Sequence, residues 1–166
     1  MARIRRELDP DTRLRRPIDI KGLFFAKNAN SFASVNIHTL VPQDETATVS
    51  RFPCFEHLMG TNIATQECMV RVPIGNDQYR NYLLAVQYDP TCPINQSLRA
   101  ITRGVNWRGA ICVLRSGRRV LATSMAGRTD QRNAIRAVRR FLVANRNLIE
   151  HATQNSRTPT FPSSLP

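Results

Sequence analysis

Acidic residues are scarce in the C-terminal part of this 166-residue chain. Residues 99–166 contain 13 arginines and only two acids, Asp130 and Glu150, whereas residues 1–98 contain 11 basic and 10 acidic residues. The net charge is therefore +11 in the C-terminal part and +1 in the rest, which together give the formal +12. Because an ordinary protein surface mixes both signs, we expect other groups to compensate these arginines. The candidates are acids of the N-terminal part, an acidic partner or phosphate.

Lysine is also scarce, since the chain has 22 arginines and only Lys21 and Lys27. A guanidinium group is planar, binds phosphate through two N–H groups and stacks on bases. Codon bias in a GC-rich genome would also replace lysine with arginine, but it would not concentrate the charge in one part of the chain. A pI near 11.1 with this asymmetry indicates an anionic partner.

The chain has no CxxC pair and no long apolar run, and residues 1–9 lack the apolar stretch of a secretory leader, so we expect no such leader. Its cysteines, Cys54, Cys68, Cys92 and Cys112, are scattered, which indicates reduced thiols in an intracellular protein of the cytoplasm or nucleus. We therefore expect no membrane span and no disulfide framework.

Recognisable catalytic motifs are missing as well: there is no GxxxxGK phosphate-binding loop, GxGxxG, GxSxG or HExxH. Cys54, His57, Cys68 and His38 are conceivable zinc ligands, but only one pair has usable spacing. Pairing Cys54 with His57, or Cys68 with His38, would give a Cys–His nucleophile, yet a buried cysteine is the commoner outcome. We expect no cofactor, no metal site and no catalytic residue, and an enzyme is the least favoured class.

The chain is long enough for one core, and its patterns predict an α+β domain. We expect an antiparallel sheet of four to six strands with two or three helices, ending in a β-hairpin followed by a long amphipathic helix. Residues 1–21 are expected to form a charged flexible arm, residues 22–153 the domain and residues 154–166 a disordered tail.

Alternating or two-sided apolar patterns predict strands at residues 34–41, 67–72 and 79–88, the last in a central position of the sheet. A short helix over residues 54–59 should stop at Gly60. A second helix, which follows Pro90–Pro93, should end at Gly104.

The C-terminal pattern is the clearest. Residues 109–115 and 118–125 flank Ser116-Gly117, which predicts a hairpin. A helix over about residues 130–152, capped by Thr129 or Asp130, follows it. At 100° per residue its apolar residues share one side, and Arg132, Arg136, Arg139, Arg140 and Arg146 share the other.

These features favour a non-enzymatic nucleic-acid-binding protein, with RNA preferred to DNA. The arginines expected to hold phosphate are those of the hairpin and the last helix, joined by Trp107 and Arg108 as a base-stacking pair. The predicted contact residues are Arg115, Arg118, Arg119, Arg128, Arg132, Arg136, Arg139, Arg140, Trp107 and Arg108.

Two other interpretations remain at this stage. A structural or interaction protein, such as a viral coat-like subunit or an adaptor, would use the same basic face to dock an acidic partner and could form a homo-oligomer. For Trp107, burial at the edge of the core is the alternative to stacking on a base. The positions of the arginines in the folded protein decide how strongly the charge asymmetry supports an anionic partner.

Overall fold

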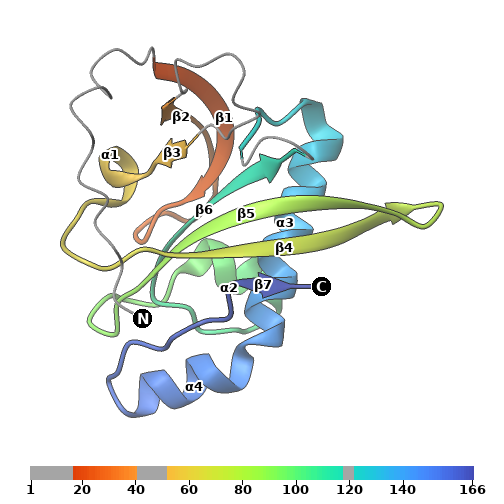
Figure 1. Ribbon diagram of the computed structural model, residues 1–166. Coiled ribbons are helices and arrows are strands. Elements are labelled where there is room, and N and C mark those ends of the chain that lie inside the picture. The colour runs from red at the N-terminus through yellow and green to blue at the C-terminus, as the bar shows by residue number, and fades with distance from the viewer. Residues whose placement is uncertain (1–16, 41–51, 118–121) are drawn as a thin grey trace.

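The protein is an α+β fold with one curled sheet and its three longest helices on one side of it (Figure 1). The computed structural model describes residues 17–40, 52–117 and 122–166. The strands are β1 Pro17–Phe25, β2 Ala33–Leu40, β3 Phe52–Cys54, β4 Gln66–Gly75, β5 Gln78–Tyr88, β6 Gly109–Ser116 and β7 Ser164–Leu165. The helices are α1 Glu56–Met59, α2 Gln96–Thr102, α3 Gly127–Ala144 and α4 Arg146–Gln154.

The sheet is larger than the sequence predicts. Within the described residues its order is β3-β2-β1-β6-β5-β4-β7, and all neighbours are antiparallel except β4 and β7. The strands predicted at residues 34–41, 67–72 and 79–88 correspond to β2, β4 and β5. Strand β5 lies between β4 and β6, as its apolar residues on both faces predicted.

Each face of the sheet buries its own apolar cluster. One face packs against α2, α3 and α4, with Trp107 and Phe141 among its largest buried side chains. The other face is closed by α1 and by the curl of the sheet, so that Ile20 and Ile37 pack with Leu114. Gly22 fits this crowded site because a Cβ there would lie 2.6 Å from Ile37 and 2.8 Å from Leu114.

The predicted last helix is two helices. Residues 127–144 form α3, and residues 146–154 form α4, which turns away from the end of α3 (Figure 1). The break falls at Asn145, whose φ and ψ are −101° and 13°. Its side-chain amide donates to the Phe141 carbonyl oxygen over 2.8 Å, and such side-chain to backbone bonds compete with the helix. Tyr88 then holds α4 on the sheet through a 2.7 Å hydrogen bond with Thr153.

The predicted disordered tail is instead folded onto the domain. Phe161 is buried, with its ring centroid 5.4 Å from that of Trp107 and 5.1 Å from that of Phe141. Gln66 accepts from the Phe161 N–H and donates to the Pro159 carbonyl oxygen, and β7 then pairs with β4. The Pro-, Ser- and Thr-rich composition predicted disorder, but one aromatic side chain and one glutamine fix the segment.

Two further boundaries differ from the sequence prediction. The charged arm was expected to reach residue 21, but β1 begins at Pro17 and pairs with β2 from Pro17 to Phe24. Of the predicted second hairpin strand, residues 118–121 lie outside the described residues. Thr123 forms an isolated bridge with Arg115, and the chain then turns to β1, where Met125 N–H donates to the Lys21 carbonyl oxygen.

Candidate functional site

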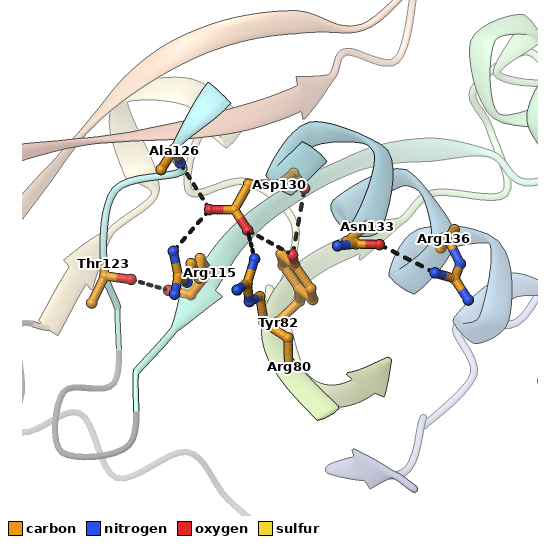
Figure 2. Close-up of polar contacts among 8 residues, drawn as sticks. All are labelled: Arg80, Tyr82, Arg115, Thr123, Ala126, Asp130, Asn133 and Arg136. Atoms are coloured by element: carbon orange, nitrogen blue, oxygen red, sulfur yellow. Dashed lines mark hydrogen bonds and ion pairs between the residues drawn. The ribbon is translucent and has the colours of Figure 1, made fainter. Parts of the chain in front are cut away.

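One buried carboxylate organises the start of α3. Asp130 is 1% exposed and lies at the centre of the contacts in Figure 2. Arg80 of β5 donates to its Oδ1 over 2.5 Å, and Arg115 of β6 donates to its Oδ2 over 2.9 Å. The Tyr82 hydroxyl donates over 3.1 Å, and the Ala126 N–H over 2.8 Å. Asp130 therefore fastens α3 to the sheet and satisfies a free N–H at the start of the helix.

The electrostatics of this cluster keep Asp130 ionised. Burial opposes its ionisation, but hydrogen bonds from Ala126 and Arg80, together with the charge of Arg115, hold its pKa below the ordinary value. Burial, reinforced by the negative charge of Asp130, raises the pKa of Tyr82 to about 12. One of the two acids in residues 99–166 is thus engaged with arginines of the sheet.

This cluster changes the role of some residues predicted to hold phosphate. Arg115 is part of the Asp130 ion pair, with a third of its side chain still exposed. Arg108 is partly buried and donates to the Cys92 carbonyl oxygen over 2.6 Å. Trp107 is fully buried, so it has no free ring face for a base. Arg118 and Arg119 lie outside the described residues.

The predicted arginines of the last helix lie together. Arg128, Arg132, Arg136, Arg139 and Arg140 are all exposed on α3, and we call this set the arginine face. At 100° per residue they occupy an arc of about 120°, opposite the buried side that contains Ala134, Ala137 and Phe141. The helix presents them outward because its apolar stripe must face the sheet.

Two arginines of the arginine face have local hydrogen-bond partners. Arg136 donates to the Asn133 side-chain oxygen over 3.2 Å, and Arg140 donates to the Pro166 backbone oxygen over 2.6 Å. Among the described residues, Asp130 is the one carboxylate that forms an ion pair with an arginine, and its partners are Arg80 and Arg115. No described acid of the N-terminal part therefore pairs with the arginine face.

The geometry of the arginine face suits an extended anion. From Arg128 to Arg140 the helix rises about 18 Å. Three i,i+4 pairs and one i,i+3 pair of like charges lie on it, and each destabilises a helix by about 0.2–0.5 kcal/mol. An anion with several negative charges along its length would relieve this repulsion at each arginine, so binding and helix stability should be linked.

Further exposed arginines lie on or directly after the helices α2 and α4, or in the segment that follows α4. They are not among the contact residues predicted from the sequence, although they contribute to the charge asymmetry of residues 99–166. Helix α2 contacts α3, and one of these arginines lies on α2 and another directly after it. These residues are Arg99 of α2, Arg103 directly after α2, Arg146 of α4, and Arg157 after α4.

The residues considered for zinc or nucleophilic chemistry have other contacts. His38 Nδ1 contacts the Asp19 carboxylate, and His57 Nε2 lies 3.3 Å from the Asn36 carbonyl oxygen. In the described part of the chain, no three or more His, Cys, Asp or Glu side chains are grouped so as to hold a metal ion. Burial, followed by the charge of Glu56, raises the pKa of the Cys54 thiol, which disfavours the thiolate that a nucleophile needs.

The cysteines are free thiols: Cys68, Cys92 and Cys112 are buried and Cys54 is partly buried. No helix in the described ranges has the length and apolar character needed to cross a membrane. Neither protein-family models, nor curated proteins, nor solved structures gave a match to this chain.

Proposed function

We propose that this protein is a non-enzymatic nucleic-acid-binding protein that holds phosphates on the arginine face of α3. The observation that carries the proposal is the row of five exposed arginines, none of which forms an ion pair with a described Asp or Glu. A nucleic acid supplies negative charges at regular intervals along its length, as this row requires. Over about 18 Å of duplex axis, one strand carries about five phosphates.

The chemistry of arginine supports phosphate as the ligand. Each guanidinium group offers several N–H donors and no acceptor, and its fork fits the oxygens of a phosphate. Contacts of this kind would give affinity that is largely independent of sequence and strongly dependent on salt. We favour RNA over DNA as the first ligand to test, because RNA presents single-stranded loops with accessible bases and phosphates.

An acidic protein is the alternative ligand for the same face. It would make the protein a structural or interaction component, such as a coat-like subunit or an adaptor. Carboxylates on a folded partner do not recur at phosphate spacing. A flexible polyglutamate of matched charge therefore tests whether net charge alone is recognised.

The test compares the binding of labelled RNA, labelled DNA and polyglutamate at about 50 mM salt. Replacing Arg132 and Arg136 with glutamate should abolish measurable nucleic-acid binding. The matched control is Arg71→Glu, because Arg71 is exposed and alternates with Val70 and Val72, which pack in the cluster that contains α3. Arg71 therefore points from the opposite face of the sheet.

The proposal predicts that the Arg71 variant binds nucleic acid nearly as well as the unmodified protein. Equal losses in both charge-reversal variants would indicate a diffuse field rather than a site on α3. Undetectable binding of RNA and DNA by the unmodified protein would refute the proposal. Preferred binding of polyglutamate would favour the acidic-protein alternative instead.

A further inference from the structure

A groove with an apolar floor adjoins the arginine face. It has a volume of about 580 Å³ and lies between the C-terminal half of α3 and the segment that contains β7. Its apolar lining comes from Val143, Ala144, Leu165 and Pro166, and its basic lining from Arg136, Arg139 and Arg140. Three of the five residues of the arginine face are therefore also walls of this groove.

The groove is built by the unexpected fold of the C-terminal segment. Leu165 pairs with Val70 in the parallel β7–β4 contact, and Arg140 binds the Pro166 backbone oxygen. These contacts place the apolar segment beside Val143, whose side chain is 47% exposed. Val143 lies three residues beyond Arg140, at the C-terminal end of the arginine row, and leaves apolar surface in contact with water. A ligand that covered this surface would gain free energy by burying it.

The hydrogen-bonding groups of the groove's side chains distinguish a nucleotide from a peptide strand as its ligand. Its polar side chains are three guanidinium groups, which donate hydrogen bonds and accept none. A peptide strand would leave its own N–H groups without side-chain acceptors in an apolar groove, which is costly. A nucleotide has acceptors on its phosphate, and its base has an apolar face that tolerates aliphatic contact and stacks on guanidinium planes.

We propose that this groove takes an unstacked base of a single-stranded nucleic acid while its flanking phosphates bind Arg136 and Arg139. This inference rests on the proposed function and specifies its ligand as single-stranded rather than duplex. In a duplex the bases are stacked and paired inside, so only the phosphates reach the arginine face. The groove therefore favours a single strand, whose unstacked base can contact it, over a duplex, whose bases cannot.

The experiment measures the affinity of three probes whose strands are about 12 nucleotides long, within the usual site size of single-strand-binding proteins. They are a single-stranded RNA without secondary structure, an RNA duplex and an abasic strand that has the backbone alone. The groove variant is Val143→Asn, and Leu165→Ser is a second one. The matched control is Leu148→Asn on α4, another exposed apolar residue outside the groove lining.

We expect the single-stranded RNA to bind the unmodified protein more tightly than the abasic strand. Val143→Asn should reduce that affinity roughly fivefold, the loss for about 40 Å² of apolar contact. The affinities for the abasic strand and for the duplex should not change, and Leu148→Asn should behave like the unmodified protein.

Equal binding of all three probes, with no effect of Val143→Asn, would overturn the groove proposal while leaving phosphate binding by α3 intact. A loss of affinity for the abasic strand in Val143→Asn would also overturn it, because that strand has no base to place. Failure of every probe to bind would refute the proposed function itself. Saturable binding of an acidic peptide that Val143→Asn weakens, without an effect on RNA, would assign the groove to a protein partner.

Discussion

Salt dependence is the sharpest quantitative consequence of the arginine face. If the five arginines each neutralise one phosphate, the logarithm of the binding constant should fall with the logarithm of salt concentration with a slope of about −3.5 for a single strand. For a duplex the slope should be about −4.5. Raising salt from about 50 mM to 200 mM should therefore weaken binding by about 130-fold for the single strand and 500-fold for the duplex.

Replacing Arg132, Arg136 and Arg139 with glutamine should change both the slope and the stability. Two arginines remain on the face, so the single-strand slope should fall to about −1.4 and the loss over the same salt range to about sevenfold. The substitutions also remove all four like-charge pairs of α3, so the free protein should be about 1 kcal/mol more stable. Weaker binding together with greater stability cannot arise from unfolding.

Fluorescence anisotropy of a labelled RNA across a salt series measures the slope, and urea denaturation measures the free energy of unfolding. Arg71→Gln is the control for loss of one charge elsewhere on the protein, and its slope should stay near that of the unmodified protein. An unmodified slope shallower than about −1, or a slope that the triple variant leaves unchanged, would refute the assignment of phosphate contacts to α3.

Three other predictions concern the structure that supports this face. Asp130→Asn should destabilise the protein by about 3 kcal/mol in urea denaturation, because it leaves two partly buried arginines without their carboxylate; a change below about 0.5 kcal/mol would show that the cluster is not structurally important. The lowered pKa of Asp130 means that its contribution is complete above the unfolded-state value near 3.9 and is lost as pH falls through the folded-state pKa, so the unmodified protein should lose more stability on acidification than Asp130→Asn. Phe161→Ala should cost about 3 kcal/mol and expose residues 155–166 to proteolysis, whereas a tail that makes no stabilising contacts would tolerate the change. Cys68, whose pKa burial raises to about 11, should react with a thiol reagent only after unfolding, and rapid reaction in the native state would contradict its buried position.

Local patterns predicted those elements whose partners are close in sequence. The strands at residues 67–72 and 79–88 were predicted from their apolar patterns, and the structure pairs them as β4 and β5 across a turn in which Asn76 and Asp77 have φ of 48° and 55°. The arginines of α3 share one exposed side because a helical period fixes their angular positions once the apolar side faces the sheet. These features need no knowledge of the remaining chain.

Features that depend on distant partners could not be predicted in the same way. Asp130 lies 50 residues from Arg80, and no spacing rule joins a helix start to the middle of a sheet. The same holds for Phe161, whose burial depends on Trp107 and Phe141 from two other segments. Asn145 did carry a local indication, since asparagine side chains compete for backbone hydrogen bonds, but the uninterrupted apolar period concealed the break.

The most direct measurement for the central claim is a titration of the isotope-labelled protein with single-stranded RNA at low salt, followed by NMR of its backbone amides and arginine side chains. The proposed function predicts that the largest shift changes fall on the side-chain signals of Arg132, Arg136 and Arg139 and on the amides of α3 and β7. The control region is the tip of the β4–β5 hairpin, which should change little. Largest changes at that hairpin, or no change at α3 when RNA is bound, would contradict the claim that α3 holds the phosphates.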